Sequence, residues 1–178
     1  GNPPYIRSEN LSNNTEKKYR QKWKTMRGRA DIYIGFFERG LSILRTNGSL
    51  SYICADRWMH NAYGKNLRRL ITEQYSMESV WEMHEVNAFE KQVSAYPAIT
   101  LIKKSELAEA TYINTSAQFD ATSAKEVLNY ITSTRTNGTG HGWNGTRLDN
   151  WFHTDSFWPS GSVDMIRLIE HLQAHFPA

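Results

Sequence analysis

The sequence has little that would mark an exported or membrane-bound protein. Its 178 residues include one cysteine, Cys54, so no internal disulfide can form. No apolar run approaches the roughly 20 residues that cross a bilayer, and no charged segment followed by an apolar stretch resembles a signal peptide. Internal repeats are also lacking, and 39% hydrophobic with 22% charged residues excludes fibrous and wholly disordered chains. We therefore expect a soluble, cytoplasmic globular protein.

The net charge of +3 is unevenly distributed along the chain. Residues 1–30 carry +6, residues 31–104 carry +1 and residues 105–178 carry −4. In the first segment the basic residues are interleaved with Tyr19 and Trp23, a pattern that could follow a phosphate backbone. A solvated helix face explains the same pattern without a ligand.

The middle of the chain predicts alternating helices and strands. Apolar residues at helical spacing follow Asp31, a suitable N-cap, and Asn47-Gly48 supplies a left-handed stop before a buried strand at residues 49–55. A second helix is expected at about residues 61–74, with Leu67, Leu70 and Ile71 facing inward and Lys65, Arg68 and Arg69 outward. Two more strands are expected near residues 79–86 and 98–104. This order predicts an α/β fold with a mostly parallel sheet, helices on both faces and a last strand that can pair antiparallel.

The remaining residues, 105–178, predict mostly helix and loop. Short helices are expected at residues 123–133 and 163–175, and the Gly-, Asn- and Thr-rich stretch 136–146 is typical of a loop. Five aromatic residues between residues 143 and 158 indicate that this part packs on the rest of the chain.

The first five residues form an unusual chemical group. Pro3 and Pro4 fix the backbone and remove two N–H donors, so nearby carbonyls become rigid acceptors, while Asn2 adds a side-chain acceptor and Tyr5 a flat ring. This set suits a planar ligand that bears an amino group. Two hydrogen bonds would favour a pyramidal nitrogen, whose lone pair could attack an electrophilic methyl group.

Asn2-Pro3-Pro4-Tyr5 resembles the Asn-Pro-Pro-Tyr motif of S-adenosylmethionine-dependent amino-methyltransferases. Further blocks are similar, in order and spacing, to DNA adenine-N6 methyltransferases of type II restriction-modification systems: Asp31-Ile32-Tyr33-Ile34-Gly35-Phe36-Phe37-Glu38-Arg39-Gly40-Leu41, Thr46-Asn47-Gly48-Ser49-Leu50, Arg57-Trp58, Tyr63-Gly64-Lys65-Asn66-Leu67-Arg68 and Phe89-Glu90-Lys91-Gln92-Val93. The resemblance covers residues 1–104. It implies a partial Rossmann-like methyltransferase sheet made of the later strands, the last one antiparallel.

The resemblance also implies the roles of individual residues. Asn2 and Pro3 would accept hydrogen bonds from the N6 amine of an adenine flipped out of double-stranded DNA, and Tyr5 would stack on its ring. Pro4 and Phe89 would help to bind this base, and Phe36 matches a position near the cofactor S-adenosylmethionine. Neither a metal nor a strong general base is implied.

Two features of the family are not found in this sequence. Members carry a Gly-rich cofactor loop upstream of Asn-Pro-Pro-Tyr and a target-recognition domain downstream. We therefore expect residues 1–104 to be the C-terminal half of a catalytic domain, and residues 105–178 an insert or connector toward the recognition domain of a parent restriction-modification polypeptide. Alone, the fragment is expected to be inactive. An RNA or protein-glutamine methyltransferase of the same fold and a non-catalytic nucleic-acid-binding module remain open.

Overall fold

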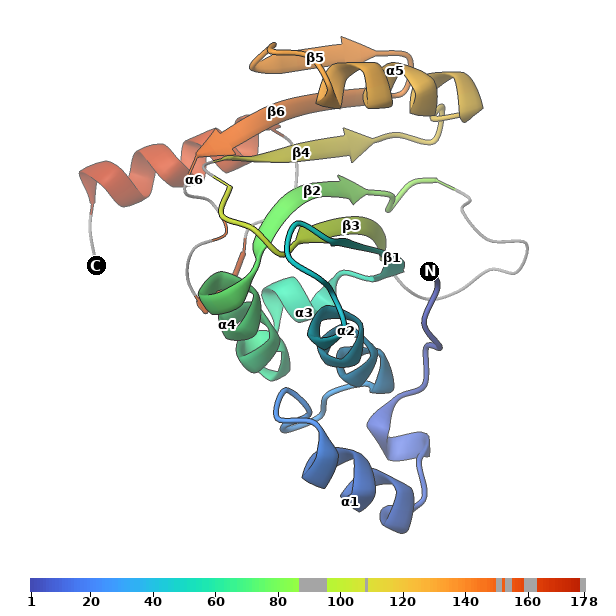
Figure 1. Ribbon diagram of the computed structural model, residues 1–178. Helices are drawn as coiled ribbons and strands as arrows, with labels where there is room; N and C mark the ends of the chain where they lie inside the picture. The colour runs from blue at the N-terminus through green and yellow to red at the C-terminus, as the bar shows by residue number, and fades with distance from the viewer. Residues whose placement is uncertain (87–95, 108, 150–151, 153–154, 159–162, 177–178) are drawn as a thin grey trace.

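The structure is a computed structural model that describes the chain except residues 87–95, 108, 150–151, 153–154, 159–162 and 177–178 (Figure 1). The described helices are the 3-10 helices η1 (Ser8–Asn10) and η2 (Ala62–Gly64) and the α-helices α1 (Asn13–Lys22), α2 (Ile32–Ser42), α3 (Arg57–His60), α4 (Lys65–Gln74), α5 (Ala121–Ile131) and α6 (Val163–His175). The strands are β1 (Ser49–Ala55), β2 (Ser76–Glu82), β3 (Pro97–Lys103), β4 (Glu109–Thr115), β5 (Asn137–Gly140) and β6 (Trp143–Asp149).

The six strands form one sheet in the order β1-β3-β2-β4-β6-β5. The α/β class is confirmed, but the expectation of a mostly parallel sheet is wrong, because only β2 and β4 pair in parallel. The cause is β3, which lies antiparallel between β1 and β2 and so separates two strands that run in the same direction. The expected antiparallel pairing of the last strand of the resemblance is confirmed.

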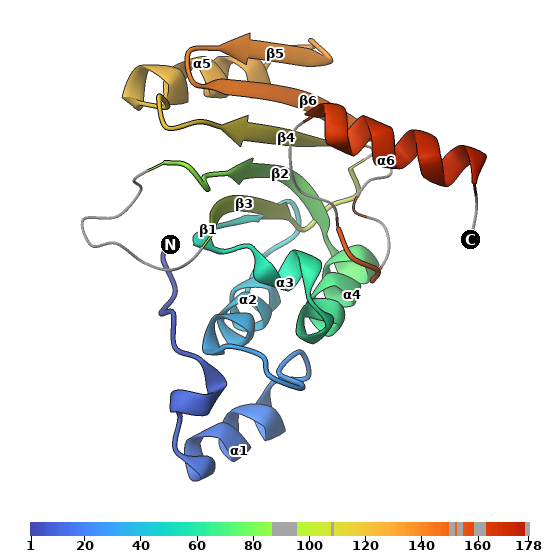
Figure 2. The same ribbon diagram turned by 180° about the vertical axis from the view of Figure 1, so that it is seen from behind.

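Helices cover both faces of the sheet, as expected. The larger core cluster joins α2, α3, α4 and α6 to one face, and a smaller cluster packs α5 on the other. Neighbouring residues of β4 show the division, since Tyr112 belongs to the larger cluster and Ile113 to the smaller one. Figures 1 and 2 view the sheet from opposite sides and show α5 and α6 on opposite faces.

Residues 105–178 differ from the expected helix and loop, because they contribute β4, β5 and β6. The glycines that suggested a loop here permit close packing instead. A Cβ atom added at Gly138 would lie 2.6 Å from the Tyr130 ring, and one at Gly145 would lie 2.6 Å from Ile113 and 2.8 Å from the Tyr130 ring. The two expected helices are confirmed as α5 and α6. No helix in the described part of the chain is long and apolar enough to span a membrane.

The predicted unit of helix, turn and strand is confirmed around β1. Asn47 has a φ of 62°, the left-handed conformation expected after α2. β1 covers the predicted residues, but the expectation of a buried strand is wrong for most of it, because β1 is an edge strand in which only Cys54 and Ala55 are buried. Cys54 itself is buried as expected. Burial raises the pKa of this thiol, which keeps it protonated and unreactive.

The predicted outward position of Arg68 is wrong. Its side chain is 1% exposed, and its guanidinium donates hydrogen bonds to the carbonyl oxygens of Trp58, Asn61 and Asp155 at 2.5, 2.9 and 3.1 Å. η2 replaces the first turn of the expected helix, α3 precedes it, and the carbonyls of Trp58 in α3 and of Asn61 between α3 and η2 both accept from Arg68. Helical periodicity alone assigns a basic residue to the solvent side, and it cannot detect main-chain carbonyl acceptors that other segments supply.

Candidate active site

Residues 1–5 lie beside the end of β1. The Gly1 ammonium group donates to the Ser51 carbonyl at 2.6 Å, and the Ile53 N–H donates to the Gly1 carbonyl at 3.0 Å. One residue that donates to position 51 and accepts from position 53 gives the hydrogen-bond pattern of two parallel strands. The Tyr5 hydroxyl then donates to the Ile53 carbonyl at 3.2 Å. The predicted amine-binding segment is therefore fixed near the carboxyl end of β1, where α/β sheets commonly bind ligands (Figure 1).

The chemical groups of this segment differ in exposure. Asn2 and Pro4 are exposed, Pro3 is buried and Tyr5 is half-buried. Pro3 thus anchors the backbone, while the Asn2 side chain stays accessible as an acceptor. Burial raises the pKa of Tyr5, so its hydroxyl remains protonated and the residue offers a neutral ring.

Phe36, another predicted site residue, lies apart from these contacts. Phe36 lies on α2, where its side chain is 38% exposed. It lines a cavity of about 560 Å³ together with two aromatic residues, three basic residues, a threonine and a glycine: Tyr19, Trp23, Lys18, Lys22, Arg39, Thr15 and Gly35. None of residues 2–5 lines this cavity. Phe89 falls outside the described residues.

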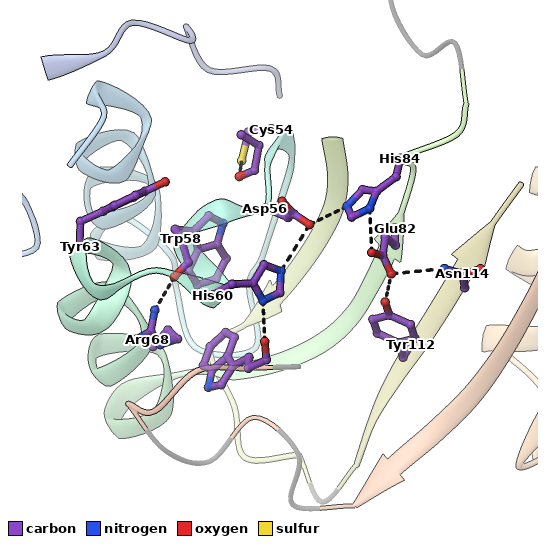
Figure 3. A network of polar contacts seen from close by, with 12 residues as sticks. Cys54, Asp56, Trp58, His60, Tyr63, Arg68, Glu82, His84, Tyr112 and Asn114 are labelled. Atoms are coloured by element: carbon purple, nitrogen blue, oxygen red, sulfur yellow. Dashed lines mark hydrogen bonds and ion pairs between the residues drawn. The ribbon is translucent and has the colours of Figure 1, made fainter. Parts of the chain in front are cut away.

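A buried network of ionisable groups lies at the ends of β1 and β2, and sequence reasoning did not identify it (Figure 3). Asp56 directly follows β1, Glu82 ends β2 and His84 comes two residues later. His84 lies between the two carboxylates, with Nε2 2.6 Å from Asp56 Oδ2 and Nδ1 2.9 Å from Glu82 Oε1. Both carboxylates are buried, and the Asp56 side chain is only 3% exposed.

Further contacts hold the two carboxylates in place. His60 Nε2 lies 3.4 Å from Asp56 Oδ2, and its Nδ1 lies 2.7 Å from the Trp158 carbonyl oxygen. The Tyr112 hydroxyl donates to Glu82 Oε2, and Asn114 Nδ2 donates to the same oxygen at 3.3 Å. The network therefore joins β1, α3, β2 and β4.

The charges of the network reinforce one another. Burial lowers the pKa of His84, but hydrogen bonds and charges from Asp56 and Glu82 outweigh burial and raise this pKa to about 9. Burial raises the pKa of Asp56, but His60 and His84 outweigh it and bring this pKa below its usual value. At neutral pH the centre is thus an imidazolium between two carboxylates.

Asp56, Glu82 and His84 offer ligand atoms that lie within 4.8 Å of one another, which raises the question of a metal. The imidazole would have to be neutral to bind one. Both His84 nitrogens already contact carboxylates, and these contacts favour the protonated ring. The donor set therefore fits an ion-pair centre better than a metal centre.

A family model described as Eco57I restriction-modification methylase matches residues 1–89, which is half of the chain. The chain belongs to this family. Type II methyltransferase M.BstVI of Geobacillus stearothermophilus is 32% identical to it over 99% of the chain. Type II methyltransferase M.PaeR7I of Pseudomonas aeruginosa is 37% identical over 99% of the chain. The chain spans about a third of these relatives, 32% and 30% of their lengths.

The fold agrees with this assignment to the Eco57I family. The structure of the type IIG restriction endonuclease BpuSI has a TM-score of 0.64 to this chain, with 97% of the chain and 21% of BpuSI covered. At 12% identity this likeness concerns the fold alone. The match of the Eco57I family model includes Asn2–Tyr5, Phe36, Asp56 and His84. The resemblance expected from the sequence is confirmed.

Proposed function

We propose that the chain is the later part of the catalytic domain of a DNA adenine-N6 methyltransferase in a restriction-modification system. The observation that carries this proposal is the position of Asn2-Pro3-Pro4-Tyr5 at the carboxyl end of β1, in a chain of the Eco57I family. Residues 1–104 would form the C-terminal half of the catalytic domain, and residues 105–178 would be an insert or connector toward the target-recognition domain. The rest of the parent polypeptide and double-stranded DNA are the proposed partners.

Residues 2–5 provide the groups that the transfer requires. The target adenine must leave the base stack before its N6 atom can react. The exposed Asn2 side chain and the Pro3 carbonyl accept the two amine hydrogens, and Pro4 has no N–H to compete for these acceptors. These hydrogen bonds favour a pyramidal N6 whose lone pair points toward the methyl donor. The methylated nitrogen is cationic and loses a proton readily, so no strong general base is needed.

Tyr5 supplies the stacking surface for the base. Its hydroxyl is held by the Ile53 carbonyl, which fixes the ring relative to β1. Ring stacking requires no ionisation, consistent with the raised pKa of Tyr5. We propose Phe89 as the second aromatic contact of the base.

S-adenosylmethionine would supply the electrophilic methyl group. Among the described residues, Phe36 is proposed to lie near it, because its ring is partly exposed in a cavity with Tyr19 and Trp23. Aromatic rings fit the adenine moiety of this cofactor. The family places the cofactor-binding Gly-rich loop and the ribose-binding acid upstream of Asn-Pro-Pro-Tyr, so Phe36 would form only one wall of the site.

The basic first 30 residues are proposed to contact DNA phosphates. α1 buries none of its residues, and Lys17, Lys18 and Lys22 are exposed. Tyr19 and Trp23, in contrast, pack against the core cluster. The lysines can neutralise phosphates and provide affinity that does not depend on sequence, whereas the two aromatic residues pack on the core and line the cavity beside Phe36.

A methylation assay tests the proposal. The complete polypeptide that carries this chain would be incubated with duplex DNA of mixed sequence and radiolabelled S-adenosylmethionine, and the product nucleosides would be identified by mass spectrometry. We expect N6-methyladenine. Asn2→Ala should abolish transfer and leave DNA binding intact, since it removes one acceptor at the amine. Asn10→Ala, an exposed asparagine on η1, is the matched control and should retain activity.

The same assay separates this function from its alternatives. N4-methylcytosine as the product would refute the adenine assignment. Methylation of RNA or of a protein glutamine, with duplex DNA unmodified, would place the chain in another branch of the Asn-Pro-Pro-Tyr enzymes. Salt-dependent DNA binding without any transfer would favour a non-catalytic module. Wild-type activity of Asn2→Ala would refute the proposed role of this residue.

A further inference from the structure

Helix α6 has an apolar face that is wider than its contact with the sheet. Ile166 is fully buried in the larger core cluster, and Ile169 is half-buried. Four other large apolar side chains are exposed by 49, 51, 45 and 74%, and we call them the α6 stripe: Met165, Leu168, Leu172 and Phe176. One part of the apolar face therefore meets the core, and the other part meets solvent.

The α6 stripe follows one side of the helix. Its members are spaced by three, four and four residues, and residues at these spacings are neighbours on a helix surface. The Phe176 N–H donates to the Leu172 carbonyl at 2.8 Å, so the helical turn continues to the last member. Arg167 donates to Asn137 of β5 at 2.5 Å and helps to hold α6 on the sheet. The later part of α6 extends beyond the strands (Figure 2).

The arrangement of the α6 stripe distinguishes it from ordinary exposed apolar residues. Single exposed apolar side chains are common on soluble proteins, whereas a contiguous apolar patch marks an interaction site. Leu128 is an example of the first kind: it is 56% exposed, and it is the one large apolar residue of α5, a helix described throughout, with such exposure. The four members of the α6 stripe are instead continuous along the helix, which predicts that a partner covers them.

The charges of this part of the chain favour a protein partner over DNA or a membrane. Residues 105–178 carry a net charge of −4, which DNA phosphates and anionic lipids would repel. Helices that lie on membrane surfaces carry many lysines and arginines on their polar side. Among its 13 residues α6 has a single residue of this kind, Arg167, which binds Asn137. The partner of the α6 stripe is therefore expected to be an apolar protein surface.

The size of the α6 stripe favours a partner in the same polypeptide over a second copy. Four side chains along about 17 Å of helix are too few to bury the roughly 800 Å² per partner that separate chains need for stable association. Covalently joined segments need less area, because their effective concentration is high. The matches to M.BstVI and M.PaeR7I cover 99% of this chain but 32% and 30% of these relatives, so more than two-thirds of each relative lies outside the match.

We propose that the α6 stripe docks against an apolar surface in the part of the parent polypeptide that lies outside these 178 residues. This inference rests on the proposed function in one respect, that the chain is part of a longer polypeptide. Ile166 holds α6 on the core while the stripe holds the docked segment. The helix thereby fixes that segment relative to the sheet that carries residues 1–5.

Photo-cross-linking in the complete polypeptide tests the docking. The photoreactive residue p-benzoylphenylalanine replaces Leu172, and the same replacement of Leu128 is the matched control, since both leucines are exposed on helices. We expect position 172 to cross-link to a peptide outside residues 1–178 of the same molecule, identified by mass spectrometry, and position 128 not to do so. A cross-link between two copies would overturn the inference, and so would the lack of any cross-link from position 172 to a peptide outside residues 1–178.

Hydrogen exchange measures how much the docking protects the partner segment. The double variant L168K/L172K is compared with Leu128→Lys in the complete polypeptide, because lysine and leucine have similar helix propensities and the change should leave α6 itself intact. We expect amides of the cross-linked segment to exchange at least about 10-fold faster in the double variant, as the loss of leucine burial implies. Exchange equal to that of Leu128→Lys contradicts the inference. If the double variant does not fold, Leu172→Gln replaces it in the same comparison.

Methylation of duplex DNA by the same wild-type polypeptide separates this inference from the proposed function. If the polypeptide forms N6-methyladenine but position 172 gives no cross-link outside residues 1–178, the docking is refuted and the function stands. If the cross-link forms but no adenine is methylated, the proposed function fails and the docking stands.

Discussion

Arg68→Met should strongly destabilise the 178-residue chain. The buried guanidinium donates three hydrogen bonds to main-chain carbonyls and lies over the Phe157 ring at 5.3 Å. A hydrogen bond to a charged group contributes about 1.5–3 kcal/mol. Methionine keeps most of the aliphatic packing but leaves the three carbonyls without this donor. The three hydrogen bonds share one side chain, and the chain around their acceptors can relax after the substitution. We therefore expect the free energy of unfolding to fall by about 4 kcal/mol, which is less than the sum of the three individual contributions.

Urea unfolding followed by tryptophan fluorescence measures this loss. Trp58 and Trp158 pack edge to face at 5.3 Å beside Arg68 and should report the local change. A loss of this size corresponds to a melting temperature lower by about 8–16 °C in a chain of this length. Arg69→Met is the matched control. Its side chain is 49% exposed and pairs with Asp155, so we expect a cost below about 1 kcal/mol. If Arg68→Met and Arg69→Met lowered the free energy of unfolding by the same small amount, the hydrogen bonds from Arg68 to the three carbonyls would not stabilise the fold.

Three further predictions follow from the structure. Gly64→Ala should prevent stable folding, which circular dichroism would show, because the new Cβ would lie 1.8 Å from the Trp58 carbonyl oxygen. The stability that His84 contributes should be complete below its unfolded pKa of 6.5 and lost as pH rises through about 9, so denaturation midpoints of the wild type, but not of His84→Gln, should fall over this range. Isothermal titration of the 178-residue chain with S-adenosylmethionine should show no micromolar binding, and such binding would contradict the assignment of the main cofactor motif to an upstream segment.

The sequence was sufficient for the elements with a regular pattern. α6 begins and ends at the predicted residues because its apolar residues recur at helical spacing, and β1 does so because Asn47-Gly48 marks where the preceding helix ends. It was insufficient for β5 and β6, whose glycines suggested a loop. These glycines are required where Tyr130 of α5 covers the strands, a tertiary contact that local propensity does not contain.

The candidate site also has one part that the sequence indicates and one part that only the structure reveals. Asn2–Tyr5 could be named as candidates from the sequence because the whole group is contiguous, and their role remains a proposal. Asp56 and His84 are 28 residues apart and follow two strands, β1 and β2, that are not neighbours in the sheet. Their position after two strands was a usable signal, since the carboxyl ends of strands with the same direction share one edge. The pairing itself required the strand order.

The antiparallel insertion of β3 explains why these groups meet. A parallel β3 would begin at the opposite edge of the sheet, and the chain after His84 would have to cross the sheet before entering it. Because β3 runs antiparallel, Tyr96 and Pro97 lie at the same edge as the ends of β1 and β2. Asp56 can then bind His84 by its side chain and Tyr96 by its backbone, across the start of β3. The departure from the expected parallel sheet is therefore the feature that brings His84 and Tyr96 together at Asp56, directly after β1.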